Sequence, residues 1–284
     1  MHKLFIIIPV HNRINLSRSC LSCLNEQTYN NFEVIIVDDG STDGTYEMIK
    51  NDFPGVIILK GDGNLWWTGA INLGIEYIRK NSKDEDFILL LNNDTMMTGN
   101  YIANIISTAV RNKNSIIGSV VINQNDKKTI IDGGCKINWI SAKFNVLNKG
   151  KKYNDVILNN TLISVDALSG RGILMPLEIF NKIGSFNFNS LPHYGADYEF
   201  SIRAKKNGYK LFIDYNAIVF TEDRHKNNNW LSLFRSFFSI CSANNIKSRW
   251  RFAILICPWY LIPSFFLLDF FRVLSGSLRN QVKK

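Results

Sequence analysis

The sequence predicts an open α/β fold in which a largely parallel sheet is covered by helices on both faces. Short apolar runs without polar alternation, such as Leu4 to Val10 and Phe87 to Leu91, are typical of strands buried on both faces. Helical periodicity lies between such runs, in Leu16 to Gln27 and in Ala70 to Lys80, so strand and helix alternate at short intervals. A chain of 284 residues can bury a large core in this arrangement.

The remaining elements follow from the same patterns. The first part is predicted to contain strands 4–10, 33–37, 56–59 and 87–91 and helices 16–27, 70–80 and 100–112. Beyond residue 112 the apolar runs are separated by turns, which favours antiparallel strands in 115–122 and 128–147. Residues 149–160 are polar and predict a loop, and 165–175 is strand-like. A helix over 196–207 stops at Gly208, and short strands are expected at 210–213 and 217–220.

Composition limits the class of protein. With 46% hydrophobic and 20% charged residues the chain is ordinary for a globular protein. Five cysteines without a framework of pairs fit a reducing compartment, and the apolar run at the N-terminus is too short for a signal peptide, so a cytoplasmic location is expected. Cys20 and Cys23 have the spacing of zinc ligands, but the sequence has no second Cys or His pair to complete a zinc site. A position on the buried face of a helix is therefore favoured for both.

Polar residues end two of the predicted strands. Asp38 and Asp39 close the second strand, and Asn92, Asn93 and Asp94 close the fourth. In open α/β sheets, ligands bind just beyond the carboxyl ends of the strands, so these carboxylates are candidates for chemistry. Taken alone, they could equally be turn or helix-cap residues. A dinucleotide-binding dehydrogenase is excluded, because residues 9–13 stand where its glycine-rich loop would be.

Four motifs together resemble the family 2 glycosyltransferases of the GT-A fold, a Rossmann-like nucleotide-diphospho-sugar transferase domain. They are residues 8–13 (IPVHNR), 37–45 (VDDGSTDGT), 92–94 (NND) and 195–199 (GADYE) followed by Arg203. The resemblance spans about residues 4 to 222 and points toward enzymes of bacterial surface-polysaccharide assembly, such as rhamnosyltransferases. It implies a GT-A domain over 1–227, while the basic and apolar residues 228–284 are expected to form an amphipathic helical tail.

The resemblance implies a nucleotide diphosphate sugar as donor, linked to UDP or dTDP. Asp38 and Asp39 can accept hydrogen bonds from a uracil or thymine imide and from a ribose hydroxyl, while Gly40 permits close backbone approach. Trp66 and Trp67 can act as flat platforms for sugar, with simple core packing as the alternative. The expected donor-binding residues are Pro9, His11, Asn12, Arg13, Asp38, Asp39, Gly40, Asn64, Trp66, Trp67, Gly69, Asn72, Asn92 and Asn93.

A divalent cation, Mg²⁺ or Mn²⁺, is also implied. Members of the family usually hold it with Asp-x-Asp, but here only Asp94 of that pattern is a carboxylate. One carboxylate can suffice when water and diphosphate oxygens complete the shell, although affinity for the free metal should then be weak. His225 stands near the position of a family histidine that meets the metal or diphosphate; a solvated loop histidine is the equal alternative.

Asp197 is the expected catalytic base. It lies in the first turn of a predicted helix, where the helix dipole favours an ionised carboxylate, and a capping role is the alternative. In a single inverting displacement it would take the proton of the acceptor hydroxyl. Gly170, Arg171 and Gly172, together with Tyr194, are expected to contact the acceptor or a phosphate, with a structural bend as the alternative for the first three.

The C-terminal tail is basic and apolar. From Asn228 onward it has eight Lys or Arg residues against one acid, and the stretch from Phe252 to Leu268 has no charge. Two prolines interrupt that stretch, so attachment to the inner face of the membrane, or a shallow re-entrant hairpin, is favoured over a spanning helix. The alternative is an appendage packed on the domain or on a second subunit of a homodimer. Nucleic-acid binding is not expected, because such tails expose cations without this density of apolar residues.

The acceptor consistent with such a tail is a glycan, carried on a polyprenyl diphosphate lipid or at the cell surface. A nucleotidyltransferase is the second enzyme class considered, but its glycine-rich basic loop after the first strand is absent. A catalytically silent glycan-binding or scaffold protein on the same fold stays open, because Asn92 replaces the first metal carboxylate.

Overall fold

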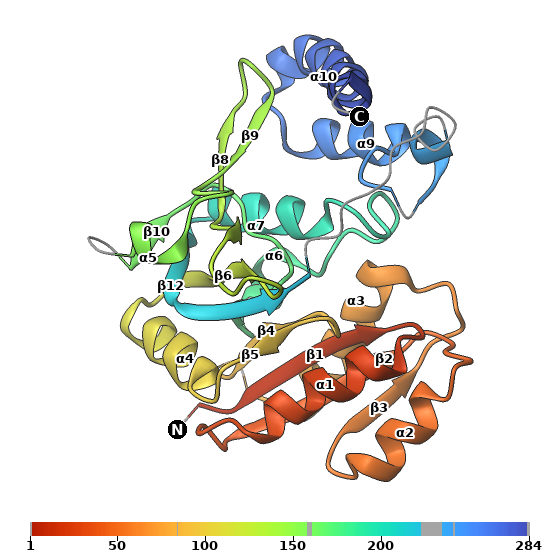
Figure 1. Ribbon diagram of the computed structural model, residues 1–284, viewed down its shortest axis with the longest axis vertical. Coiled ribbons are helices and arrows are strands. Elements are labelled where there is room, and N and C mark those ends of the chain that lie inside the picture. Colours follow the sequence, from red (N-terminus) through yellow and green to blue (C-terminus); the bar gives the residue numbers. More distant parts are fainter. Residues whose placement is uncertain (1, 84, 158–160, 223–234, 241, 283–284) are drawn as a thin grey trace.

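A computed structural model describes residues 2–83, 85–157, 161–222, 235–240 and 242–282. Within these residues ten strands form one mixed sheet, whose main path runs β10-β12-β6-β11-β4-β1-β2-β3. The short strands β5 and β7 pair with β12 and β6, and β8 and β9 form a separate hairpin (Figure 1). The strands are β1 Leu4–Val10, β2 Phe32–Asp38, β3 Ile57–Lys60, β4 Phe87–Leu90, β5 Met96–Met97, β6 Ser115–Asn123, β7 Ile130–Asp132, β8 Cys135–Asn138, β9 Lys143–Val146, β10 Leu162–Ser164, β11 Ile173–Pro176 and β12 Lys210–Thr221.

Helices cover both faces of this sheet, as the sequence predicted. Apolar side chains of α1, α2 and α4 join the core on one face, and those of α3, α6 and α7 join the core on the other. The helices are α1 Ile14–Asn25, α2 Thr45–Asp52, α3 Trp66–Asn81, α4 Tyr101–Arg111, α5 Tyr153–Val156, α6 Ile179–Ile183, α7 Ala196–Lys206, α9 Ile246–Ile256 and α10 Ile262–Val282, with a 3₁₀ turn, η1, at Trp259–Leu261.

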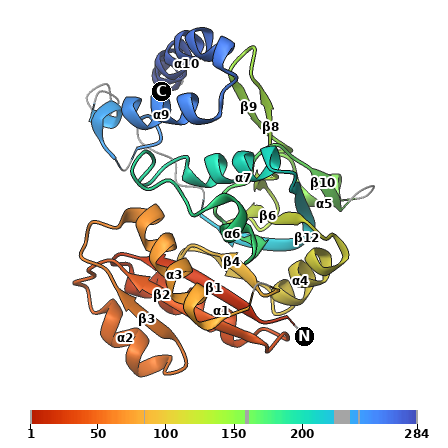
Figure 2. The same ribbon diagram turned by 180° about the vertical axis from the view of Figure 1, so that it is seen from behind.

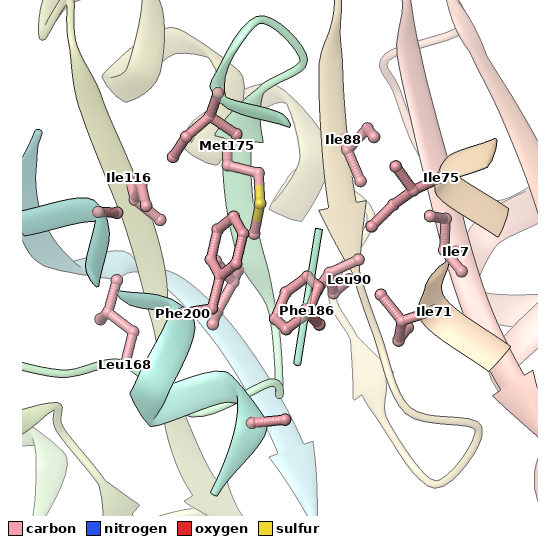
Figure 3. Packing of buried hydrophobic residues seen from close by; sticks show 14 of the residues in the cluster. Ile7, Ile71, Ile75, Ile88, Leu90, Ile116, Leu168, Met175, Phe186 and Phe200 are labelled. Carbon is pink, nitrogen blue, oxygen red and sulfur yellow. The ribbon is translucent and has the colours of Figure 1, made fainter. Parts of the chain in front are cut away.

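The continuous apolar runs form strands because both faces of the sheet are buried. In β1, Phe5 and Ile7 contribute to one core, whereas Leu4, Ile6 and Ile8 contribute to the other. This alternation is the period of two that a strand imposes on its side chains. Figure 3 shows the first core, in which Phe186 stacks on Phe200 of α7 with ring centroids 4.2 Å apart.

Arg203 of helix α7 attaches this helix to the segment before it. Arg203 Nε lies 2.7 Å from Glu199 Oε1, and the guanidinium also donates to the carbonyl oxygens of Ile183 and Ser185. Glu199 is almost completely buried. Its charge is paired with Arg203 of the same helix, and the hydrogen bonds from Arg203 to Ile183 and Ser185 hold α7 against the segment before it.

The C-terminal helices pack at one end of the molecule against the β8–β9 hairpin and α7 (Figures 1 and 2). Phe252 and Ile256 of α9 join a small core with Ala167 and Ile202. In the part of the chain that the structure describes, no helix is long and apolar enough to cross a membrane.

Candidate active site

Four loops meet at one edge of the sheet. Strands β1, β2 and β4 run parallel, so their carboxyl ends lie side by side. Strand β11 runs in the opposite direction and pairs Ile173 with Leu90, so the segment before β11 begins at the same edge. We call this edge the carboxyl rim; it gathers residues 11–13, 38–40, 92–94 and 170–172.

Asp39, just after β2, fixes the loop that follows β3. Its carboxylate accepts hydrogen bonds from the backbone N–H groups of Gly63 at 2.8 Å and Trp66 at 3.0 Å. The Asp38 carboxylate accepts one from the Ser41 N–H at 3.0 Å. Both carboxylates are buried. The two acids therefore shape the rim, and their contacts with a base and a ribose stay predictions.

Residues 11–13 turn the chain from β1 into α1. Asn12 and Arg13 have φ values of 59° and 69°, a left-handed conformation that is uncommon outside glycine. The turn is held because Nδ1 of His11 lies 2.7 Å from the carbonyl oxygen of Asp39. Arg13 Nη1 then lies 3.6 Å from Oδ2 of Asp94. The unusual backbone places a cation beside the carboxylate at the end of β4.

The three polar residues after β4 make separate contacts. Asn92 Oδ1 accepts a hydrogen bond from the indole Nε1 of Trp67 at 3.2 Å. Asn93 is buried and its amide donates to Ser17 Oγ of α1 at 3.0 Å. Asp94 is partly exposed beside Arg13. Asp94 is thus the residue of this motif that presents a carboxylate with a cation next to it.

The two tryptophans at the start of α3 pack differently. Trp67 lies against Gly170 so closely that a Cβ on the glycine would come within 2.6 Å of its Cζ2. Trp67 also meets Phe186 edge to face, with centroids 5.6 Å apart. Trp66 has φ 54° and its ring meets His193 at 5.9 Å. Trp67 therefore packs among the residues that form the carboxyl rim. Contact of either tryptophan ring with a sugar stays a prediction.

Asp197 lies in the first turn of α7, as the sequence predicted for that helix. Its Oδ2 accepts a hydrogen bond from the Gly170 N–H at 2.8 Å, and its Oδ1 accepts one from the Tyr198 N–H at 2.9 Å. Burial raises the pKa of Asp197, while the Gly170 and Tyr198 N–H groups oppose that rise. A carboxylate with a raised pKa is a better proton acceptor than an ordinary aspartate, which suits a general base.

A short chain of contacts joins the end of β4 to this base. Asn92 binds the indole of Trp67, Trp67 lies on Gly170, and the Gly170 N–H binds Asp197. The motifs around residues 92–94 and 197, a hundred positions apart in sequence, are therefore neighbours in the fold. Arg171 lies in the same connection, and its charge acts against the rise in the pKa of Asp197.

Asp132 is a further carboxylate near this base, and the sequence pattern did not single it out. Its negative charge contributes to the raised pKa values of Asp197 and Tyr198. It ends β7, is buried, and accepts a hydrogen bond from the Gly134 N–H at 2.9 Å. The signal that could have drawn attention to it is an acid placed directly before two glycines, which permit a tight turn.

Other expected site residues lie around the rim. Pro9 is within β1 opposite Val37, and Gly40 packs against Gly63 with φ +75°. Asn64 is exposed in the loop that Asp39 holds. The side chain of Tyr194 is exposed beside His193, with ring centroids 4.7 Å apart. His225 lies outside the described residues.

Asn72 joins α3 to the segment before α7. Its Nδ2 donates to the Phe186 carbonyl oxygen at 2.9 Å, and its Oδ1 accepts from the Phe186 N–H at 3.1 Å. We expect Asn72→Ala to lower the free energy of unfolding by about 2 kcal/mol, since it leaves two polar groups of a buried residue without these partners. Thermal unfolding measures this as a Tm lower by about 4–8 °C.

Asn81 provides a matched control on the same helix. It is exposed and its amide donates to the Tyr77 carbonyl oxygen at the C-terminal end of α3. Asn81→Ala should change the free energy of unfolding by less than about 0.5 kcal/mol, as is usual for surface substitutions. Equal losses of stability for the two variants would contradict a bridging role of Asn72.

Residues 5–172 match the family described as Glycosyl transferase family 2, which covers more than half of the chain and all of the rim up to Gly172. The chain belongs to this family. The matched region includes the strand ends that carry Asp39 and Asp94, whereas α7 and Asp197 lie beyond it.

Relatives with curated sequences are also glycosyltransferases by name. An uncharacterized glycosyltransferase of Rickettsia conorii is 31% identical over 188 residues, which is 64% of this chain and 28% of the relative. Glycosyltransferase GlyA of Streptococcus pneumoniae is 28% identical over 110 residues, 38% of this chain and 15% of the relative. The chain thus spans about a quarter of the length of the first such relatives.

Solved structures of other glycosyltransferases share the fold. Mannosyltransferase PcManGT from Pyrobaculum calidifontis, in complex with GDP-Man and Mn²⁺, has a TM-score of 0.61 at 12% identity, covering 99% of this chain and 75% of its own. GalNAc-T7, crystallised with UDP, GalNAc and Mn²⁺, has a TM-score of 0.62 at 15% identity, covering 80% and 45%. The GT-A fold expected for this family 2 member is confirmed.

The donor atoms for a cation in this family 2 chain are few. Among the residues described, no three His, Cys, Asp or Glu side chains lie close enough together to hold a metal ion. Asp94 supplies a hard oxygen donor at the rim, beside the guanidinium of Arg13. Such a donor set fits a divalent cation that takes most of its ligands from water and substrate.

Proposed function

We propose that this protein transfers a sugar from a nucleotide diphosphate sugar, linked to UDP or dTDP, to a hydroxyl group of a glycan acceptor. The acceptor would be a lipid-linked or cell-surface glycan, met at the inner face of the cell membrane. The observation that supports this most is the contact chain from Asn92 through Trp67 and Gly170 to Asp197. It joins the rim that matches the family to a partly buried carboxylate of raised pKa.

In the proposed reaction Asp197 takes the proton of the acceptor hydroxyl. The acceptor oxygen forms a bond to the anomeric carbon of the donor sugar, and the bond from that carbon to the diphosphate oxygen breaks on the opposite face. The products are the lengthened glycan, with inverted configuration at the transferred sugar, and a nucleoside diphosphate. The N–H groups of Gly170 and Tyr198 orient the Asp197 carboxylate for this proton transfer.

Asp94 would hold the Mg²⁺ or Mn²⁺ ion, with water and diphosphate oxygens completing its shell and His225 as a further candidate ligand. Bound there, the ion would neutralise the negative charge that develops on the departing diphosphate. Arg13, 3.6 Å from Asp94, places a second positive charge at the same point. Asp39 contributes by holding the loop of residues 63–66, which carries Trp66.

The direct test is to incubate the purified full chain with Mn²⁺ and UDP-, dTDP- and GDP-linked sugars, with water as a slow acceptor. Release of free nucleoside diphosphate from one nucleotide class is expected, together with a rise in Tm on adding that donor. If no donor is cleaved and none raises the Tm, the proposal is wrong, and binding of a glycan to the same protein would then favour a silent glycan-binding scaffold.

A further inference from the structure

Over residues 262–272, where its side chains are described, helix α10 turns two charged side chains inward and several apolar side chains outward. Phe265, Asp269 and Arg272 lie along the stripe that meets the rest of the protein, and Asp269 is only 6% exposed. On the opposite stripe Leu267 and Phe271 are 59% and 57% exposed. A surface helix in water normally carries its charged side chains on the outer stripe, so this part of α10 departs from the usual pattern although Phe265 still packs inward.

The inward polar residues are fully engaged. Asp269 forms a two-pronged ion pair with Arg249 of α9, with Nε to Oδ2 at 2.6 Å. Arg272 donates to the carbonyl oxygens of Ser141 and Ala142 in the turn of the β8–β9 hairpin. These contacts set the rotation of α10 about its axis, so the exposed apolar stripe is a fixed feature of the packing.

The elements that directly precede α10 also carry exposed apolar side chains. Ile254 and Leu255 of α9 are exposed, and Trp259 and Tyr260 of η1 are 81% and 65% exposed. We call these four residues, with Leu267 and Phe271, the outer apolar surface. Exposed apolar side chains gathered on consecutive elements in this way mark an interaction surface.

The charges around this surface favour an anionic partner. Residues 235–272 contain five Arg or Lys residues and one acid, Asp269, which is already paired with Arg249. Lys247 on α9 and Lys143 on the hairpin are exposed. A symmetric contact between two copies would bring the same cations together without acids to match them, which disfavours a dimer through this surface. Tryptophan and tyrosine, moreover, prefer the boundary between headgroups and acyl chains.

We propose that the outer apolar surface lies in the headgroup region of an anionic membrane leaflet. This deepens the membrane attachment in the proposed function by naming the surface, and its test needs no catalysis. The same elements contact the segment that precedes the catalytic helix: Arg251 donates to the Asn189 carbonyl oxygen at 2.9 Å, and Phe252 packs on Gly195. A membrane-bound α9 would therefore hold the carboxyl rim at a fixed distance from the leaflet, within reach of a lipid-carried acceptor.

Vesicle flotation of the full chain tests the proposal. Vesicles of phosphatidylcholine that contain about 30% phosphatidylglycerol should bind the protein at least about tenfold more tightly than vesicles of pure phosphatidylcholine. Each cation near an anionic surface adds about 1 kcal/mol to the free energy of binding. Trp259→Ser with Tyr260→Ser should lower binding by about tenfold or more, because two interfacial aromatics are removed. Added salt should weaken binding of the unmodified chain.

The control is Val110→Ser, which removes a 44%-exposed apolar side chain from α4, far from α10 (Figures 1 and 2). It should leave vesicle binding unchanged. Leu267→Ser with Phe271→Ser tests the α10 stripe if the first pair of substitutions impairs folding, which thermal unfolding reports. The proposal would be overturned if vesicle binding did not depend on lipid charge, or if neither pair of substitutions weakened it. It would also be overturned if the chain bound no vesicles and light scattering showed that these substitutions convert a dimer into monomers.

Discussion

Asp197→Asn is expected to lower kcat for sugar transfer by about 10³-fold, within the range that general bases contribute. Asparagine has nearly the shape of aspartate, so its Oδ1 can still accept a hydrogen bond from the Tyr198 or the Gly170 N–H. It cannot take a proton from the acceptor hydroxyl. The KM for the donor should change by less than about threefold, because the base contacts the acceptor. Steady-state release of nucleoside diphosphate in the presence of acceptor measures both constants.

The pH profile of the same reaction gives an independent check. Burial raises the pKa of Asp197, and the charge of Asp132 adds to the rise. The base must be ionised to accept a proton, so kcat/KM should increase as pH rises through this pKa, which is raised above the ordinary aspartate value. In Asp197→Asn the residual activity should no longer show this increase of kcat/KM with pH on the acidic side of the profile.

Asp155→Asn is the matched control, because Asp155 is an exposed carboxylate on α5. Its activity and pH profile should equal those of the unmodified protein. If Asp197→Asn kept normal kcat and the same increase of kcat/KM with pH, a different group would be the base and Asp197 would be only the residue that holds Gly170 in place.

Elements defined by local pattern could be predicted from the sequence. The first strand was predicted at 4–10 and is Leu4–Val10, and the predicted helix 196–207 is Ala196–Lys206. Continuous apolar runs and a stop glycine act over a few residues, so one segment contains the whole signal. Helix α2, Thr45–Asp52, was not predicted, because only Met48 and Ile49 among its apolar residues face the core.

Boundaries that depend on distant residues could not be predicted. Helix α3 begins at Trp66, four residues before the predicted start, because Asp39, 27 positions earlier, accepts the Trp66 N–H. The strands expected at 210–213 and 217–220 are one strand, β12, whose register shifts between Asp214 and Ile218 along its pairing with β6. In both cases the deciding partner comes from another part of the chain.

The site shows the same division. Sequence motifs located the polar strand ends and Asp197, because each residue type has a recognisable setting at a strand end or helix start. Nothing in a single sequence indicated that Trp67 would lie on Gly170, or that Asp132 would influence Asp197. These contacts arise where β7, β11, α3 and α7 meet, and that arrangement is a property of the sheet order.

Asp94→Asn should lower kcat/KM by about 10³-fold at a fixed, subsaturating Mn²⁺ concentration, since removing the carboxylate weakens metal binding and loses several kcal/mol of charge stabilisation. It should also leave the guanidinium of Arg13 without the carboxylate 3.6 Å away. Raising the Mn²⁺ concentration should recover part of the activity, because substrate and water still supply ligands. Donor-dependent release of nucleoside diphosphate across a Mn²⁺ titration measures both effects.

Two further variants test whether the effect depends on a carboxylate at the end of β4 and not on any carboxylate of the protein. Asp52→Asn removes a surface carboxylate paired with Arg18 at 2.6 Å and should leave the Mn²⁺ titration unchanged. Asn92→Asp adds a carboxylate at the rim and can still accept the hydrogen bond from Trp67, so half-maximal activity should need about tenfold less Mn²⁺. If neither Asp94→Asn nor Asn92→Asp moved the titration, the cation would not be held at the end of β4, and the proposed neutralisation of the diphosphate would fall to Arg13 alone.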